Sequence, residues 1–411
     1  MSQTVIIGAG PAGLAAGIAA AMRGVRVRVI DEFVKPGGRL LGQLHQEPNG
    51  DWWNGIEEAR QLFDEAKAAG VNIELGTSVY DLRRTETGWS VATTNGIINT
   101  PSVLLATGAA ETAVPLPGWT LPGVMSIGAA QVMTNVQRVR VGARGIVIVV
   151  NILSVAITRE LQLAGIKVDR MVLPPVNELN EHAAQPLHVM KSMLRVAHLA
   201  PSGLIRLGSQ LMQSEGMQKL GVRFFPPSGV SMWGIPIQLR TAALEIVGER
   251  QVEGVRIARI TPDGDPIPGT EKLISADFVC IAGGLYPLAE LAAVAGCPFA
   301  YIPELGGHVP LHNKEMSTPL PGLYTAGNIT GIESAKVAKA QGTVAGLAIA
   351  NRYGPHAGHL SSALSTAIEQ VQHVRAQATI QFHPHIEEGR KRVAALFDAH
   401  QQSEQPIVSP R

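Results

Sequence analysis

Apolar and polar positions near the N-terminus follow the order of a β-α-β unit. Residues 4–7 form a short apolar run, a glycine-rich turn follows, and an alanine-rich segment extends to Arg23 before Gly24 interrupts it. Residues 25–30 then alternate Val or Ile with Arg, as the residues of a strand do. Because glycine directly after the last helical residue is a stop signal, the pattern predicts strand, helix and strand.

The same pattern returns later in the chain. Further strands are predicted at residues 71–75, 89–93 and 102–106, where apolar residues lie between turn-forming ones. Residues 145–150 begin a second unit of strand, helix and strand, whose helix ends near Gly165. The chain therefore contains two nucleotide-binding-like domains in tandem.

The order of these segments predicts how the domains are connected. From Leu273 onward the sequence returns to the strand-and-glycine style of the first domain. We therefore expect an α/β fold of two Rossmann-like dinucleotide-binding domains, with the second inserted in the first and a C-terminal helical appendage. The first domain is predicted to span residues 1–118 and 275–350, the second residues 119–274, and the appendage residues 351–411.

Two helical segments complete the prediction. Residues 177–220 are partly basic, and their apolar spacing predicts a helix with one apolar face. That face would pack on the core or bind a partner. In the appendage, residues 364–376 are predicted to be helical.

Composition and charge narrow the class of partner. The 411 residues are 45% hydrophobic and 16% charged, with a net charge of +1. A balance so close to neutral does not favour nucleic acid or an anionic membrane. Residues 5–22 carry no charge, but they contain a proline and several glycines and follow no basic segment, which argues against a membrane span or a signal peptide.

The two cysteines, Cys280 and Cys297, are too far apart for a C-x-x-C redox pair and too few for a cysteine-ligated iron-sulfur cluster. Both lie in apolar surroundings and are predicted to be core residues. We expect a cytoplasmic protein.

The glycine-rich turn carries the first candidate chemistry. In Gly-Ala-Gly-Pro-Ala-Gly, Gly8 permits the tight turn after the strand, Gly10 lets the backbone approach a pyrophosphate, and Gly13 permits close helix packing. The helix that follows directs its N–H groups and positive dipole end toward the phosphates. Asp31 and Glu32, which end the next strand, can accept hydrogen bonds from ribose hydroxyls. This turn therefore predicts binding of the ADP half of a dinucleotide.

Several motifs resemble those of one superfamily. They are Ala-Thr-Gly-Ala-Ala-Glu at 106–111, Pro-Gly-Trp-Thr-Leu-Pro-Gly-Val-Met at 117–125 and Gly-Leu-Tyr-Thr-Ala-Gly-Asn-Ile-Thr-Gly at 322–331. Over residues 1 to about 350 the chain resembles the FAD-dependent flavoprotein disulfide reductase superfamily. Within it, the chain is most similar to the α subunits of heteromeric amine, opine and proline dehydrogenases, hydrogen cyanide synthase and sarcosine oxidase.

The resemblance implies that the first site holds FAD. In such proteins the Ala-Thr-Gly turn lies beside the cofactor, and a late Gly-Asp pair places a carboxylate near the ribityl chain; here that position is Asn328, whose amide can still hydrogen-bond a hydroxyl. The backbone at Val79 is in the place that contacts the adenine. The complete set of predicted cofactor residues is Gly8, Gly10, Pro11, Ala12, Gly13, Asp31, Glu32, Gly38, Arg39, Val79, Thr107, Gly108, Gly327 and Asn328.

The second dinucleotide turn departs from the superfamily pattern. The expected Gly-x-Gly-x-x-Gly is replaced by Val-Val-Asn-Ile-Leu-Ser-Val-Ala at residues 149–156, without a glycine. Side chains of Asn151, Ile152 or Leu153 would occupy space that a pyrophosphate needs. We therefore expect that NAD(P) does not bind there in the usual way.

The resemblance also implies partners. The leading hypothesis is an FAD-binding α-type subunit that relays electrons from a β subunit resembling D-amino acid oxidases, with a possible FMN at the subunit interface and a separate small iron-sulfur protein. The substrate would be an amine or amino-acid-like compound. The alternatives are a stand-alone NAD(P)H-dependent flavin reductase and a structural subunit that binds an adenine nucleotide without redox turnover.

No catalytic residue or metal site is assigned from the sequence. His308 and His312 precede the late glycine motif, and His308 is a candidate for a role near the flavin. The remaining histidine pairs, His356 with His359 and His383 with His385, match no metal-ligand spacing and are predicted to be surface residues. Trp52 and Trp53 are assigned either to packing or to a contact with a cofactor or partner.

Overall fold

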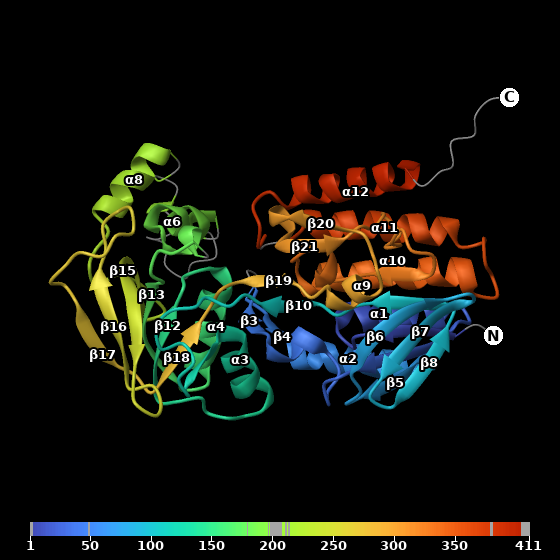
Figure 1. The fold of residues 1–411 in the computed structure, drawn as a ribbon, viewed down its shortest axis with the longest axis horizontal. Coiled ribbons are helices and arrows are strands. Elements are labelled where there is room, and N and C mark those ends of the chain that lie inside the picture. Colours follow the sequence, from blue (N-terminus) through green and yellow to red (C-terminus); the bar gives the residue numbers. More distant parts are fainter. Residues whose placement is uncertain are drawn as a thin grey trace. The chain divides into compact units, whose positions relative to one another are not determined.

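The computed structural model describes residues 3–47, 50–178, 180–195, 197, 208, 209, 212, 214–378 and 381–403, and statements about structure refer to these residues. The chain forms two compact units (Figure 1). Unit 1 comprises Met1–Leu41, Asn54–Ala110 and Leu285–Arg411; unit 2 comprises Gly42–Trp53 and Glu111–Gly284. The insertion of one Rossmann-like unit into another, followed by C-terminal helices, confirms the predicted fold class.

Unit 1 is built on a parallel sheet whose strands run in the order β22-β9-β1-β2-β5. Strand β1 is buried along its described side chains, as expected for a central strand covered on both faces. The chain order reverses beside β1, because β2 pairs with one of its edges and β9 with the other. In open α/β sheets, ligands bind at such a switch point, beyond the carboxyl ends of the strands. The strands are β1 (Gln3–Ile7), β2 (Arg26–Asp31), β5 (Asn72–Leu75), β9 (Ser102–Leu105) and β22 (Leu323–Thr325).

Helices α1 (Pro11–Ala21) and α10 (Ala335–Tyr353) pack closely, and α11 (Ser361–Ala376) packs on α10 (Figure 1). A Cβ atom at Gly342 would overlap the carbonyl oxygen of Ala12, and one at Gly346 would overlap that of Ala16. Small residues on both helices therefore let the two backbones meet. Helix α12 (Ile386–Ser403) packs on strand β20 (Phe299–Ile302) and the 3₁₀ turn Pro303–Leu305.

The remaining elements of unit 1 surround this sheet. Helix α2 (Gly55–Ala68) packs on α1. Its N-cap is Asn54, whose side chain accepts from the N–H groups of Ile56 and Glu57. Strands β6, β7 and β8 form an antiparallel sheet, and β20 and β21 form a hairpin. The bounds of these strands, and of the neighbouring elements β19 and α9, are β6 (Val79–Thr85), β7 (Gly88–Thr93), β8 (Gly96–Thr100), β19 (Leu285–Pro287), α9 (Glu290–Val294), β20 (Phe299–Ile302) and β21 (Gly307–Pro310).

Unit 2 contains a mixed sheet in the order β11-β18-β12-β13-β15-β16-β17, with β14 paired to β15. Strands β11, β18, β12, β13 and β15 pair in parallel, whereas β14, β16 and β17 are antiparallel to their neighbours. The core is rich in Val and Ile. The strands are β11 (Val124–Ser126), β12 (Arg144–Ile148), β13 (Lys167–Leu173), β14 (Val230–Met232), β15 (Ile235–Val247), β16 (Gly254–Arg259), β17 (Lys272–Ser275) and β18 (Phe278–Ile281).

The helices of unit 2 are α3 (Ile127–Gln131), which continues as a π-helical turn over Val132–Val136, α4 (Ile152–Leu163), α5 (Glu181–Ala184), α6 (Pro186–Arg195) and α8 (Glu215–Arg223). The helical region predicted for residues 177–220 includes α5, α6 and the start of α8, while residues 179, 196, 198–207, 210, 211 and 213 lie outside the described part. Helix α6 packs against β15 and α8. Strands β3 (Leu44–Gln46) and β4 (Trp52–Asn54) pair with each other in the segment Gly42–Trp53 of unit 2, and only Asn54 belongs to unit 1.

Candidate cofactor site

Three glycines shape the turn between β1 and α1, for different reasons. Gly8 has φ +109°, and a Cβ atom there would overlap the carbonyl oxygen of Ala106. A Cβ at Gly13 would overlap the carbonyl oxygen of Gly8. At Gly10, by contrast, an added Cβ would meet no described atom within 4 Å. The fold itself therefore requires Gly8 and Gly13, whereas Gly10 leaves open space in which a ligand can approach the backbone.

The start of α1 supplies donors toward that space. Gly10 is the N-cap residue and Pro11 follows it, and among the described residues no side chain caps the helix. Pro fits this first helical position because it lacks an N–H group that would need a partner. Since the first N–H groups of a helix have no partner within it, the start of α1 is suited to bind an anion. The buried Ala12 and Gly13 lie in this first turn.

Asp31 joins the end of β2 to the glycine turn. Its Oδ2 accepts a hydrogen bond from the N–H of Ala9 at 2.6 Å, and its Oδ1 accepts one from the N–H of Phe33 at 2.8 Å. The carboxylate is half-buried, and its oxygens can accept further bonds from ribose hydroxyls. Glu32 is exposed beside it.

The Gly-Gly-Arg segment at residues 37–39 lies against the same turn. The N–H of Gly37 donates to the carbonyl oxygen of Ala9 at 2.8 Å, and a Cβ atom at Gly38 would lie 3.2 Å from the Cα of Gly10. The exposed Arg39 donates from Nε and Nη2 to the carbonyl oxygen of Ala109 at 3.2 and 3.0 Å. Gly38 and Gly10 therefore form a close backbone contact at the edge of the open space.

Two predicted residues, Thr107 and Gly108, follow the end of β9, and a third does not. Thr107 follows β9, and its hydroxyl donates to the carbonyl oxygen of Leu288 at 2.5 Å. Gly108 has φ +80°, and in the described structure an added Cβ there would have no neighbour within 4 Å. Val79 lies elsewhere, at the start of β6, half-buried and paired with Thr93. Its assignment to an adenine contact stays a prediction.

The loop after β22 returns to the glycine turn. Gly327 has φ +82°, its N–H donates to Gln341 Oε1 at 2.9 Å, and a Cβ at Gly327 would lie 2.9 Å from that of Ala12. Asn328 Oδ1 accepts the N–H of Glu333 at 3.3 Å. Gln341 was not predicted from the sequence, although it is a polar residue within the Ala- and Gly-rich run of α10.

The predicted residues after β1, β2, β9 and β22 thus gather at the carboxyl edge of one parallel sheet. The open space at Gly10, the start of α1 and the Asp31 carboxylate fit the pyrophosphate and ribose of a dinucleotide.

The corresponding turn of unit 2 has another construction. Val149, Asn151 and Ser154 follow β12 as Gly8, Gly10 and Gly13 follow β1, and Val149 adopts φ +77°. Asn151 Oδ1 accepts the N–H of Ser154 at 2.8 Å, Ser154 Oγ accepts the N–H of Asn151 at 2.9 Å, and Asn151 Nδ2 donates to Ala282 O at 2.8 Å. The side chain of Asn151 therefore occupies the start of α4 with a capping box, where a phosphate would otherwise bind.

Comparisons with known proteins agree with this fold. The family described as pyridine nucleotide-disulphide oxidoreductase matches residues 2–150. The opine oxidase A subunit of Agrobacterium tumefaciens is 30% identical over 84% of this chain and 64% of its own length. Hydrogen cyanide synthase subunit HcnB of Pseudomonas aeruginosa is 24% identical over 84% of this chain and 70% of its own length. The chain is similar to members of the FAD-dependent disulfide reductase superfamily of oxidoreductases.

Solved structures related to this superfamily share the fold. Thioredoxin reductase from T. acidophilum aligns with a TM-score of 0.59 at 21% identity, covering 85% of this chain and 98% of that one. L-proline dehydrogenase from P. horikoshii aligns with a TM-score of 0.61 at 17% identity, covering 89% of this chain and 58% of that one. The predicted resemblance to this superfamily is confirmed. The chain spans 64% and 62% of the length of two opine oxidase A subunits.

The two cysteines are not available for dithiol chemistry. Cys280 and Cys297 are both free and buried. Burial raises the pKa of the Cys280 thiol and raises that of Cys297 to about 12. Because the thiolate is the reactive form, neither residue is a nucleophile at neutral pH.

His308 and His312 have different surroundings. His308 is exposed and packs against Tyr301, with ring centroids 4.9 Å apart. The His312 ring is half-buried; its Nδ1 lies 2.8 Å from Pro310 O, and burial lowers its pKa. Among the described residues, no group of three or more His, Cys, Asp or Glu could hold a metal ion. Within the same part of the chain, no helix is both long and apolar enough to cross a membrane.

Proposed function

We propose that this chain is the FAD-binding subunit of a multi-component dehydrogenase or oxidase that acts on an amine or amino-acid-like substrate. One observation carries the proposal: the turn at Gly10 leaves open space beside a helix without a side-chain cap, whereas Asn151 fills the equivalent position of the second turn. One dinucleotide site is open and the other is closed by the protein itself.

The roles of the residues follow from this asymmetry. The start of α1 would bind the pyrophosphate, Asp31 would accept from the ribose, and Gly38 would keep the backbone close to Gly10. FAD, when bound, supplies reversible two-electron chemistry and one-electron transfer. Because the second turn is closed, the electrons would come from a partner subunit instead of a nicotinamide.

The names of the relatives support a partner. The opine oxidase A subunit, the HcnB subunit of hydrogen cyanide synthase and the alpha subunit of sarcosine oxidase from Rhizobium meliloti are all named as subunits. We propose a partner of the D-amino acid oxidase type that oxidises the substrate, with an FMN at the subunit interface and a separate small iron-sulfur protein as further carriers. The protein would function in the cytoplasm.

The decisive experiment is purification from the native source, with identification of co-purifying chains and of the nucleotides released on denaturation. Yellow protein that releases FAD and carries a second, substrate-oxidising chain would support the proposal. Rapid bleaching of the flavin by NADH or NADPH under anaerobic conditions would instead identify a stand-alone reductase and refute the closure at Asn151.

A second function is favoured by Asn328. An amide stands where a carboxylate is expected from the resemblance, while the open turn and Asp31 would recognise only the ADP half of a ligand. A structural subunit that binds an adenine nucleotide without redox turnover would have these features. Colourless native protein that releases ATP, ADP or NAD would establish that role.

A further inference from the structure

The loop at residues 327–334 connects β22 to α10 and contacts the start of α1. Gly327 lies against Ala12, and its N–H donates to Gln341 Oε1. The Thr330 hydroxyl donates to Gly327 O at 2.8 Å, and Gln341 Nε2 donates to Thr330 Oγ1 at 3.1 Å. The far end of the loop is tied to its beginning, because the N–H of Glu333 donates to Asn328 Oδ1. A displacement of Glu333 would therefore be transmitted to Asn328 and Gly327.

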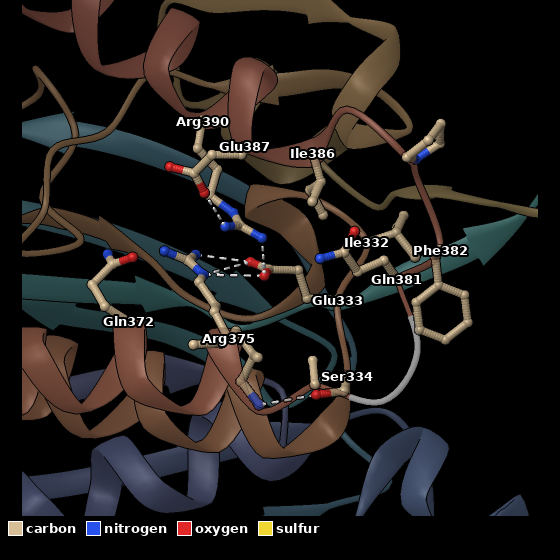
Figure 2. A pocket seen from close by; sticks show the side chains of 14 residues that line it. Ile332, Glu333, Ser334, Gln372, Arg375, Gln381, Phe382, Ile386, Glu387 and Arg390 are labelled. Carbon is tan, nitrogen blue, oxygen red and sulfur yellow. Dashed lines mark hydrogen bonds and ion pairs between the residues drawn. The ribbon is translucent and has the colours of Figure 1, made fainter. Parts of the chain in front are cut away.

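The Glu333 carboxylate lies between two arginines from the C-terminal helices (Figure 2). Arg375 on α11 donates from Nε to Oε1 at 3.0 Å and from Nη2 to Oε2 at 2.8 Å. Arg390 on α12 donates from Nη2 to Oε1 at 2.6 Å. The side chains of Glu333, Arg375 and Arg390 are 8%, 14% and 18% exposed. We refer to these three residues as the ionic clamp.

Because the ionic clamp is buried, it restricts the conformation of the loop more than it stabilises the fold. Removing charges from water offsets most of the attraction within a buried ion pair, so its net contribution to folding is small. Separating one partner from the others, however, leaves a buried charge without compensation, which is strongly unfavourable. The ionic clamp therefore penalises any position of the loop in which Glu333 leaves the two arginines.

A second contact joins the same elements. The N–H of Ile332 donates to Leu305 O at 3.1 Å, and a Cβ atom at Gly331 would lie 3.0 Å from the Leu305 side chain. On α12, a Cβ atom at Gly389 would lie 2.9 Å from the same side chain. The loop and α12 thus meet across Leu305 as well as at Arg390.

We infer that Glu333, Arg375 and Arg390 are positioning residues, through which α11 and α12 hold the loop at residues 327–334 in its cofactor-binding conformation. The appendage then contributes to the cofactor site through this loop. This inference rests on the proposed cofactor site for its functional consequence, while the mechanical coupling can be measured on the chain alone.

The test compares Arg375→Ala with Glu387→Gln in the full chain. Glu387 accepts from Arg390 Nη1 at 2.7 Å but is 61% exposed, so its loss leaves the contacts of Glu333 intact. Amide hydrogen exchange of residues 327–334 and the dissociation rate of added FAD are measured for each variant. In Arg375→Ala we expect both rates to rise about tenfold, and in Glu387→Gln neither to change.

Arg375→Lys keeps the positive charge but not the bidentate hydrogen bonding of the guanidinium, so both rates should be intermediate. This variant tests the inference if Arg375→Ala does not fold. Unchanged exchange in the loop would overturn the inference, as would faster exchange without faster release of FAD. If the wild-type chain binds no FAD, the proposed function fails; the exchange data then still show whether the clamp holds the loop.

Discussion

Asn151 and Ser154 bond reciprocally at the start of α4, each accepting from the backbone N–H group of the other at 2.8 and 2.9 Å. This pair occupies the positions at which the first turn has Gly10 and Gly13. A side chain thereby satisfies donors that a phosphate satisfies in a functional dinucleotide turn. The second Rossmann-like unit can keep its fold without a ligand.

The capping pair should contribute to stability. Asn151→Ala removes the cap and is expected to lower the free energy of unfolding by about 1 kcal/mol. Ser154→Ala removes the other half, and because the two bonds are coupled the double variant should lose less than the sum of the single losses. Chemical denaturation of the four proteins measures this; strict additivity would show that the capping box is not formed.

Restoring one glycine should not restore nicotinamide binding. In Asn151→Gly the start of α4 loses its cap, but Val149 and Ser154 still lack the features of Gly8 and Gly13. We expect no flavin reduction by NADH in anaerobic mixing. The comparison is the triple variant with glycine at positions 149, 151 and 154, which restores all three glycines of the motif. Flavin reduction by NADH in the single variant would contradict the prediction and show that Asn151 alone closes the site.

A substitution at Gly10 should impair nucleotide binding without impairing folding. Gly10→Val should abolish retention of the nucleotide, because the side chain would enter the open space beside α1, while the thermal midpoint of the nucleotide-free protein changes little. Gly13→Val is the contrasting variant, since its Cβ would overlap Gly8 O and prevent folding. Nucleotide released on denaturation is measured per chain. Full occupancy in Gly10→Val would show that the site assignment is wrong.

Asp31 should support both the turn and the ligand. Asp31→Ala leaves the N–H groups of Ala9 and Phe33 without their acceptor, at a cost of about 1–3 kcal/mol. We expect a lower thermal midpoint and weaker nucleotide binding. The neighbouring Glu32→Gln changes an exposed carboxylate and serves as control. Equal losses in both variants would indicate a general charge effect and not the hydrogen bonds of Asp31.

Local sequence rules predicted much of this architecture. The glycine spacing and the alternating strand at residues 25–30 indicated the first β-α-β unit, because each depends on neighbours within a few positions. The closure of the second turn was also visible, since any side chain at residue 151 fills the space of a glycine. Neither prediction needed knowledge of distant parts of the chain.

Long-range contacts were beyond such rules. Nothing near Glu333 indicates that arginines 42 and 57 residues further along the chain would surround it. Similarly, the segment Gly42–Trp53 belongs to unit 2, although it follows Gly37 and Gly38 of unit 1 closely in the sequence. Both depend on how separate elements pack, and periodicity within one element carries no information about its partner.

Glu160 in α4 should make stability depend on pH. Its carboxylate is 5% exposed and accepts from Gln131 Nε2 at 2.8 Å, Asn135 Nδ2 at 2.8 Å and the N–H of Leu44 at 3.2 Å. Burial raises its pKa from 4.5 to about 7, against the lowering effect of these hydrogen bonds. The folded protein therefore holds a proton that the unfolded chain releases.

The direction of this pH dependence follows from the linkage between proton binding and folding. Below pH 4.5 both states are protonated; between pH 4.5 and about 7 the folded state binds more protons, so stability falls as the pH rises, by an amount on the order of 3 kcal/mol. Glu160→Gln cannot ionise and should remove this part of the profile, while the exposed Glu271→Gln should retain it. Urea denaturation from pH 5 to 8 measures the difference. Parallel profiles for Glu160→Gln and the wild type would show that Glu160 ionises normally, and that the hydrogen bonds of Gln131 and Asn135 outweigh its burial.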